Sequence, residues 1–459
     1  MATNNRSTTA DLIPTACEVL PNGMILDLVR EEGNGEVGFL TQDGDRYRIV
    51  SRFEYEGKTY VPAAADPTIL SALRLPTRAA SYTSTRELFN EISKLLALYN
   101  DLPERFVSQI AYFIFGTWLV DRVPTAPFLS ILAPSTALRG VLLQLLALLC
   151  RRSLLLTAEN PAGLWTLPMH LRPTLLLEAA ELGVPVQKFL RASSSQGIHF
   201  PRNGHALDLY CAKAVCSPEP LRDARLASSA LQISLAPTRR GLPALSEEAS
   251  HRIAEEFQAK LLMYRTKKYS RVRPPDFDVA GLTAPTQCLA RSLAACIVDD
   301  DKLQAELVPL LRQQDREFQV ERVGGLESVI LEALLCCCHD RNRSTVRVAE
   351  LAEITNSILA RRGEIPRVSP ETVGRRLKSL RFRTEPVGSS GNGLWLLGEV
   401  CAMIHKLAVE YEVQQDPVKE CTHCWGSTDK LQKEENRAGD GECTSEDDGD
   451  ACDPSNPDG

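Results

Sequence analysis

The stretch from Ala133 to Gly140 has the setting of a phosphate-binding loop. The apolar run before it, Phe128 to Leu132, predicts a buried strand, and the apolar pattern after it, Val141 to Cys150, predicts a helix. The arginines that follow, Arg151 and Arg152, carry the charge that suits a helix C-terminus. A strand, a turn and a helix in this order hold a phosphate when backbone N–H groups of the turn point at its oxygens.

A second stretch, Arg172 to Glu181, reads RPTLLLEAAE and predicts a strand that ends at an acidic residue, Glu178. A carboxylate at that place can orient Mg²⁺ beside a phosphate. Together the two stretches resemble the Walker A and Walker B motifs of plasmid- and phage-borne replicative helicase/primase ATPases. The resemblance covers about residues 80 to 415 and implies a P-loop ATPase-type core followed by a winged helix.

The residues at the Walker A positions depart from the family's loop, Gly-Pro-x-Gly-Ser-Gly-Lys-Ser/Thr. Leu138 takes the place of the glycine before the lysine, where a branched side chain would project towards the phosphates. Arg139 takes the place of the lysine, and its planar head group is not equivalent. Gly140 has no hydroxyl for Mg²⁺. The candidate nucleotide-binding positions of this degenerate site are Ala133, Ser135, Thr136, Leu138, Arg139, Gly140, Glu178 and Ser217.

The Walker B and sensor positions depart as well. The residue after Glu178 is Ala179, which cannot act as the general base that a glutamate would supply there. Ser217 lies at the polar tip of the stretch that resembles the family's sensor strand, and Ser229 aligns with a family arginine. Arg239 and Arg240 match the family and would contact phosphate or cap the surface.

Phosphoryl transfer needs all of these groups together. We therefore expect no catalytic residues and no required cofactor, and the chain is expected not to be an enzyme. The alternative that the chain binds ATP and Mg²⁺ without cleaving the ATP stays open. Three functions stay in competition: a DNA-associated component with a non-hydrolysing site, an active helicase with an unusual loop, and a protein-interaction scaffold. A strand–turn–helix that was never a P-loop would explain the same residues.

A basic segment from Arg361 to Arg383 carries eight Lys or Arg against two Glu. The predicted helix within it, Pro370 to Leu380, starts well, with Ser369 as N-cap and Pro370 in the first turn. Helices at Leu326–His339 and Val346–Arg361 and a strand at Leu394–Leu397 complete a winged-helix pattern. The DNA-binding candidates are Arg375, Arg376, Lys378, Arg381 and Arg383, with Lys267 and Lys268 at the basic, tyrosine-containing end of an earlier helix. There are two alternatives to DNA binding: the winged helix docks proteins, or the basic helix end is simply solvated.

Fourteen cysteines are scattered through the sequence, many in apolar helical patterns, which is typical of reduced residues. His339 follows Cys336, Cys337 and Cys338, but these side chains would point in different directions on one helix. Cys421 and Cys424 form a CxxC pair, whereas Cys443 and Cys452 lie too far apart for the second half of a zinc ribbon. We therefore expect no metal site, with zinc at the tail cysteines as the lesser alternative.

The charge is uneven along the chain. Residues 416–459 hold 13 Asp or Glu and 4 Lys or Arg, so they contribute −9 to a total of −7. The remaining sequence is near +2, which is compatible with a nucleic-acid partner. We expect DNA as a partner, and a homo-oligomer or an active ATPase relative as further partners. The sequence has no signal-peptide core and no run long enough to cross a bilayer, so we expect a cytoplasmic protein without a membrane partner.

Five apolar runs separated by helical stretches predict an α/β core, a parallel sheet with helices on both faces. These runs are Phe128–Leu132, Leu154–Thr157, Thr174–Leu177, Lys213–Cys216 and Leu231–Leu235. Turn pairs such as Asn34-Gly35 separate short β-type runs before them. The expected domains are a disordered lead (1–16), a small β domain and linker (17–78), the degenerate ATPase-like core (79–240), a helical subdomain (241–325), a winged helix (326–415) and a disordered acidic tail (416–459).

Overall fold

The computed structural model describes residues 11–424 except 44–45, 134–135, 203, 222, 237–240, 275–277, 324, 341–342, 364–367, 388–390, 412, 414–420 and 422. It divides into a core unit, residues 1–316, and a C-terminal unit, residues 317–459. Arg239, Arg240 and most of the acidic tail lie outside the described residues.

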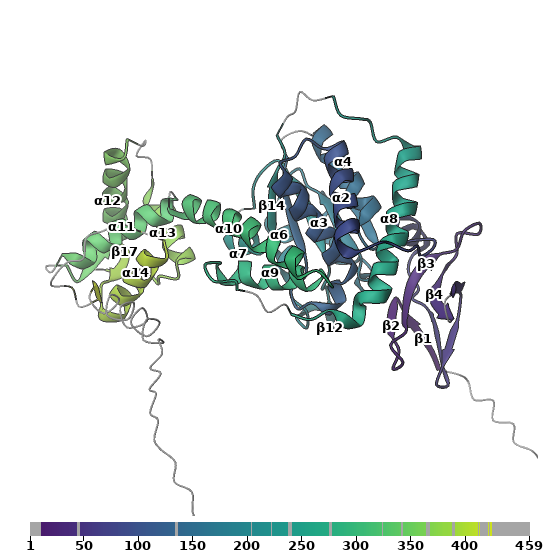
Figure 1. Cartoon of the computed structure of the whole chain (residues 1–459). Coiled ribbons are helices and arrows are strands. Elements are labelled where there is room, and N and C mark those ends of the chain that lie inside the picture. Colours follow the sequence, from purple (N-terminus) through teal and green to yellow (C-terminus); the bar gives the residue numbers. More distant parts are fainter. Residues whose placement is uncertain are drawn as a thin grey trace, which may run out of the picture. The chain divides into compact units, whose positions relative to one another are not determined.

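The N-terminal part of the core unit consists of two small sheets (Figure 1). One is antiparallel, in the order β2-β3-β4-β5, and the other has the order β1-β7-β6. The turns at Gly35 and Gly57 have φ of 70° and 76°, a conformation that favours glycine. The first strand begins at Asp11, inside the stretch expected to be disordered, because it pairs in parallel with β7. The bounds are β1 Asp11–Thr15, β2 Cys17–Val19, β3 Ile25–Arg30, β4 Val37–Asp43, β5 Arg46–Val50, β6 Phe53–Tyr55, β7 Lys58–Pro62 and α1 Pro67–Ala72.

The central sheet of the core unit has five strands in the order β14-β8-β13-β10-β9, and each neighbouring pair is parallel. The predicted parallel α/β sheet is therefore confirmed. The strands are β8 Phe128–Leu132, β9 Ser153–Thr157, β10 Thr174–Glu178, β13 Lys213–Ser217 and β14 Leu231–Ser234. Because parallel strands end at the same edge, the carboxyl ends of β8, β13 and β10 lie next to one another.

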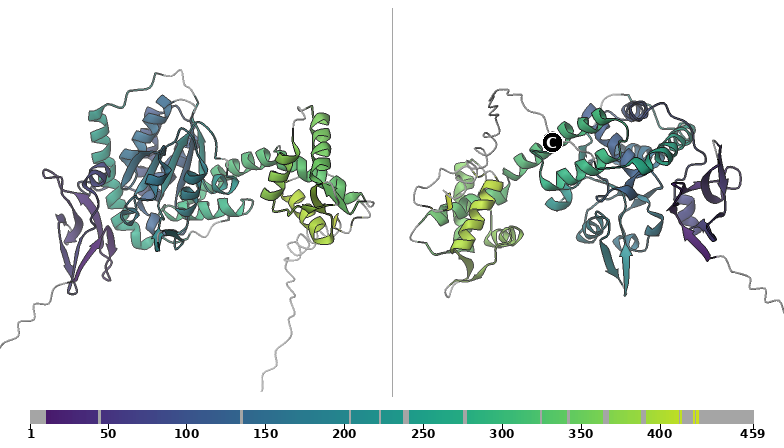
Figure 2. Two further views of the ribbon diagram at one scale, coloured as in Figure 1. Left: turned by 180° about the vertical axis from the view of Figure 1, so that it is seen from behind. Right: turned by 60° about the horizontal axis from the view of Figure 1, so that its bottom comes forward.

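Side chains of the central sheet alternate between two apolar clusters. Leu129, Ile131 and Leu176 pack in one cluster with the helices α2 (Thr85–Tyr99), α3 (Glu104–Trp118), α4 (Thr136–Leu149), α8 (Glu247–Lys268) and α9 (Ala284–Ala295). Phe128 and Leu175 pack in the other with α6 (Val184–Ala192) and with residues of the N-terminal sheets. Helices thus cover both faces of the sheet (Figure 2). This period-two alternation explains why each strand reads as a continuous apolar run.

The remaining elements of the core unit are short or peripheral. They are η1 Val120–Arg122, α5 Pro161–Leu164, η2 Met169–Leu171, β11 His199–Arg202, β12 His205–Asp208, α7 Ala224–Ser228, η3 Tyr269–Arg271 and α10 Asp301–Val323. Helices α8 and α9 and residues 303–311 of α10 belong to the same apolar cluster as α2 to α4. The sequence predicted a helical subdomain at 241–325, and in the structure these helical residues lie within the core unit.

A buried set of charges, the Asp27 cluster, joins the N-terminal sheet to the helices. Asp27 on β3 accepts hydrogen bonds from Arg151 Nη2 at 2.9 Å, Arg152 Nη2 at 2.5 Å and Arg265 Nε at 2.5 Å. Arg265 also contacts Asp121 Oδ2 at 2.6 Å. Burial alone raises the pKa of Asp27, but the three guanidinium groups outweigh burial and hold that pKa well below its ordinary value.

The Asp27 cluster corrects two sequence-based interpretations. Arg151 and Arg152 do not merely neutralise the end of α4; they are 2% and 1% exposed and bind a carboxylate from another sheet. Arg265 and Tyr264 belong to the helix end that was a candidate for nucleic-acid binding through Lys267 and Lys268. Both are 0% exposed, and the Tyr264 hydroxyl donates to the Cys296 carbonyl at 2.7 Å. They are part of the core and not of a nucleic-acid surface.

The C-terminal unit combines helices with a three-stranded sheet in the order β15-β17-β16. Its helix α13 begins as predicted, because Ser369 Oγ accepts from Thr372 N at 3.3 Å and Pro370 is the first helical residue. Gly393 on β17 is required by close packing, since a Cβ there would lie 2.4 Å from the Val346 carbonyl oxygen. The elements are α11 Leu326–His339, β15 Thr345–Arg347, α12 Val348–Arg361, α13 Pro370–Ser379, β16 Glu385–Pro386, β17 Asn392–Trp395 and α14 Gly398–Glu410.

Among the described residues, no helix is both long and apolar enough to cross a bilayer. The apolar stretch from Ile110 to Val120 is instead the inner part of α3 and its continuation, buried in the core unit.

Candidate functional site

The nucleotide-type edge is the region where β8, β10 and β13 end and α4 begins. The sequence predicted a turn as far as Gly140, but α4 begins at Thr136, so Leu138, Arg139 and Gly140 are helical. Residues 134–135, which include the candidate Ser135, lie outside the described residues, and the side chains of Thr136 and Leu138 are not described. The helical start leaves fewer turn residues to surround a phosphate than the predicted loop had.

Arg139 and Glu178, assigned to the lysine and the magnesium-orienting acid, face each other at this edge. Arg139 Nε lies 3.4 Å from Glu178 Oε1, and the Arg139 side chain is 11% exposed while that of Glu178 is 34% exposed. In an active site of this type, phosphates and Mg²⁺ would separate two such groups. Here the cation and the anion neutralise each other directly.

Two further polar groups that are described at the nucleotide-type edge, the Ala133 N–H and the Ser217 hydroxyl, form hydrogen bonds within the fold. The N–H of Ala133 donates to the Ser217 carbonyl at 2.9 Å, which continues the pairing of β8 with β13. Ser217 is 3% exposed, and its hydroxyl donates to the Glu219 carbonyl at 2.5 Å. Ala179 is buried at 1% exposure and has no acid–base group. Burial raises the pKa of the adjacent Cys216 thiol to about 12, so it is not a nucleophile at neutral pH.

The exposed basic side chains of α13 form the second candidate region. Val373 and Leu377, four residues apart, are 0% exposed and attach the helix to the unit, so the opposite side faces solvent. Arg375, Lys378, Arg381 and Arg383 are exposed there or just beyond the helix. Arg376 is also exposed, but its Nη1 lies 2.7 Å from Glu327 Oε1 on α11. The sequence-based set is therefore grouped in space, with Arg376 partly neutralised.

The two lysines proposed at the end of α8 do not join that surface, since they belong to the core unit. Lys267 is exposed, and Lys268 forms an ion pair with Asp299, which also binds Arg271. Their tyrosine neighbours are buried, so stacking on bases at this helix end is not available.

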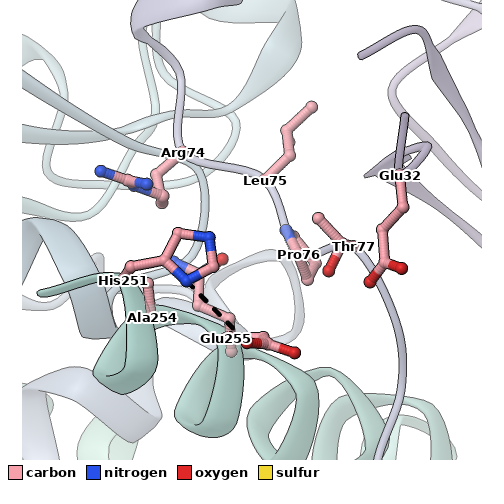
Figure 3. Close-up of a pocket in the computed structure, with 9 residues that line it drawn as sticks. Glu32, Arg74, Leu75, Pro76, Thr77, His251, Ala254 and Glu255 are labelled. Atoms are coloured by element: carbon pink, nitrogen blue, oxygen red, sulfur yellow. Dashed lines mark ion pairs between the residues drawn. The ribbon is translucent and has the colours of Figure 1, made fainter. Parts of the chain in front are cut away.

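A small cavity of about 320 Å³ lies elsewhere in the core unit, between the segment Arg74–Thr77 and α8 (Figure 3). His251 and Glu255 line it, with His251 Nδ1 3.9 Å from Glu255 Oε2. Glu32 reaches it from the N-terminal sheets. The cavity shares no lining residue with the nucleotide-type edge.

Four side chains with metal-ligating atoms meet in the C-terminal unit, and one of them, His405, was not a candidate from the sequence. His339 at the end of α11, His405 on α14, and Cys421 and Cys424 after it have one donor atom each within 4.8 Å of one another. We call this the His–Cys cluster. The CxxC pair was the available signal, but nothing in the local spacing indicated that its partners would be two histidines on separate helices.

No family model matches this sequence, and no curated protein matches it. Among solved structures, the A-form apo NrS-1 C-terminal region aligns over 81% of this chain and 95% of its own, at 12% identity and a TM-score of 0.33. Cdc6p from Pyrobaculum aerophilum aligns over 76% and 99%, at 14% identity and a TM-score of 0.21. Drosophila ORC bound to DNA aligns over 75% and 95%, at 13% identity and a TM-score of 0.20. At these identities and TM-scores the likeness carries no argument about function.

Proposed function

We propose that this chain is a DNA-binding or regulatory component with a degenerate, non-hydrolysing ATPase-type core and a winged-helix C-terminal unit. The observation that carries the proposal is the Arg139–Glu178 ion pair, at 3.4 Å, in the place where a working site would hold phosphate and Mg²⁺. Binding Mg-ATP there would require the pair to be broken, and Ala179 would still provide no general base.

The DNA-binding part of the proposal rests on α13. A helix anchored by Val373 and Leu377, with Arg375 and Lys378 exposed, can bring its cations to phosphates or base edges in a groove. The antiparallel strands β16 and β17 would supply the wing of such a domain. A DNA-binding measurement distinguishes this proposal from the alternative, in which α13 is only a solvated basic helix.

The nucleotide part is tested by Mg-ATP turnover with and without single-stranded DNA. No turnover above the buffer rate is expected for the unmodified chain, because Ala179 provides no carboxylate to position and activate the attacking water. Turnover that Glu178→Gln abolishes would overturn the proposal and establish an active ATPase. An ATPase of related type, assayed in the same buffer, serves as the positive control.

The DNA part is tested by affinity measurements across a salt series. Arg375→Ala with Lys378→Ala should weaken binding and reduce the slope of log K against log salt by about 1 for each lost phosphate contact. Lys406→Ala is the matched control, since Lys406 is an exposed lysine on α14 of the same unit. Equal affinity and slope in all variants would refute DNA binding by α13.

A further inference from the structure

The His–Cys cluster has the donor set of a zinc site. Three distances involve ring nitrogen and sulfur: 3.3 Å between Cys421 Sγ and His405 Nε2, 3.3 Å between Cys424 Sγ and His339 Nε2, and 3.4 Å between Cys424 Sγ and His405 Nε2. The two Nε2 atoms are 3.1 Å apart. His405 is buried, and the other three residues are partly buried.

These four separations are close to the edges of a tetrahedron around one ion, and all six separations among the donor atoms are within 4.8 Å. With Zn–S of about 2.3 Å and Zn–N of about 2.0–2.1 Å, tetrahedral geometry places nitrogen and sulfur roughly 3.5 Å apart and two nitrogens roughly 3.3 Å apart. The observed distances lie within about 0.3 Å of those values. Two thiolates and two imidazoles are the ligands of the common Cys₂His₂ structural site.

The hydrogen bonding of His405 also orients it as a ligand. Its Nδ1 lies 2.7 Å from the Cys401 carbonyl oxygen, which can only accept, so Nδ1 carries the proton. In the neutral ring, Nε2 then presents a lone pair to the centre of the cluster. His339 Nε2, Cys421 Sγ and Cys424 Sγ surround that lone pair, so four metal-ligating atoms converge on one point.

We infer that His339, His405, Cys421 and Cys424 bind a structural zinc ion in the C-terminal unit. This corrects the expectation of no metal site, which considered His339 only with its neighbouring cysteines and the CxxC pair only with Cys443 and Cys452. The thiols bind as thiolates, so uptake of one Zn²⁺ releases two protons if both begin protonated. The inference does not depend on the proposed DNA or nucleotide functions.

Four protein ligands leave no open position, so the geometry assigns a structural and not a catalytic role. The ion would fasten the CxxC segment to α11 and α14, two helices that already pack through residues such as Leu334 and Ile404. The neighbouring Cys338 and Cys401, with sulfur atoms 3.4 Å apart, are not among the four ligands.

Zinc content of the purified full chain, measured by elemental analysis after dialysis against metal-free buffer, tests this inference. About one zinc per chain is expected, falling at least about tenfold in Cys421→Ala with Cys424→Ala and in His339→Ala. Two controls should keep their zinc: Cys336→Ala, an exposed cysteine on α11, and Cys443→Ala with Cys452→Ala. Loss in the second control would overturn the assignment in favour of a cysteine-only site.

Cobalt(II) substitution gives a readout that does not depend on the folding of a variant. The intact chain, stripped of zinc and reloaded with Co²⁺, should show the visible absorption of a tetrahedral complex with thiolate charge-transfer bands. Cys424→His keeps four ligands and should retain the visible bands with weaker charge transfer. The absence of both zinc and a tetrahedral cobalt spectrum in the intact chain would refute the site.

Discussion

The nucleotide-type edge and the His–Cys cluster are opposite cases of how sequence spacing relates to chemistry. At the edge, the order of strand, turn and helix matches a known motif, yet Arg139 and Glu178 neutralise each other at 3.4 Å. In the cluster, no motif connects the four residues, yet their donor atoms converge within 4.8 Å. The comparison teaches that a motif's spacing indicates where a site would lie, whereas the donor atoms decide what it can bind.

The same contrast appears at the two ends of α4. Its first turns carry Arg139, which is paired with a partly exposed carboxylate, and its last turn leads to Arg151 and Arg152, which are paired with the buried Asp27. Exposed pairs contribute little to stability, whereas a buried pair is costly to break because the remaining charge stays desolvated.

Asp27→Asn should destabilise the core unit by about 3–5 kcal/mol, because the buried guanidinium groups of Arg151 and Arg152 would lose their carboxylate. Thermal unfolding of the full chain by calorimetry measures the effect. Asp66→Asn, at an exposed helix cap, is the control and should have little effect on stability, because asparagine caps a helix about as well as aspartate. Equal effects of the two substitutions would show that the Asp27 cluster is not a principal support of the core unit.

Zinc and Mg-ATP should act differently on thermal stability. Free zinc at roughly 100 to 1,000 times its dissociation constant should stabilise the C-terminal unit by about 3–4 kcal/mol, since only the folded cluster binds it. Mg-ATP should cause no shift, because Arg139 and Gly140 stand where the family's loop has its lysine and its magnesium-binding hydroxyl. Calorimetric scans with each ligand separately measure the two shifts. A Mg-ATP shift that Glu178→Gln removes would show that the nucleotide-type edge binds Mg-ATP, contrary to this prediction.

Acid should unfold the core unit through its buried carboxylates. The pKa values of Asp27 and Asp121 are both held below the ordinary value: burial raises each, but the neighbouring arginines outweigh it. Their stabilisation is therefore complete above the unfolded pKa of about 3.9 and is lost as pH falls below it. Tryptophan fluorescence against pH measures the transition, and Asp27→Asn should make the remaining stability less dependent on pH in that range. An unchanged dependence of stability on pH in Asp27→Asn would contradict this explanation.

The Arg139–Glu178 pair should contribute only about 0.5–1 kcal/mol in a double-mutant cycle of Arg139→Met and Glu178→Gln, since Glu178 is about one-third exposed. Arg78 and Glu255, 3.2 Å apart and more exposed, form the matched control pair and should couple more weakly. Denaturant unfolding of the four variants gives the coupling energy. A coupling no larger than that of the control would mean that the two groups do not act as a pair.

The central sheet and several helices could be predicted from the sequence because their signals are local. Phe128–Leu132 is β8 with unchanged bounds, and Leu326–His339 is α11 with unchanged bounds, since apolar runs and periodicity directly reflect burial. Ser369 and Pro370 likewise marked the start of α13. The sequence did not predict the early start of α4 at Thr136, because the resemblance to the family favoured a loop there. Residues 136–140 can nevertheless be helical.

The sequence by itself determined the order of strands and helices, the five parallel-strand segments and the basic character of α13. Only the tertiary structure decided which charged and ligand-forming side chains meet. Asp27 and Arg265 are 238 residues apart in sequence, and His339 and Cys424 are 85 apart, yet each pair is in contact. The physical reason is that periodicity records which side of an element is buried, whereas a specific contact between distant polar groups depends on how several buried faces pack together.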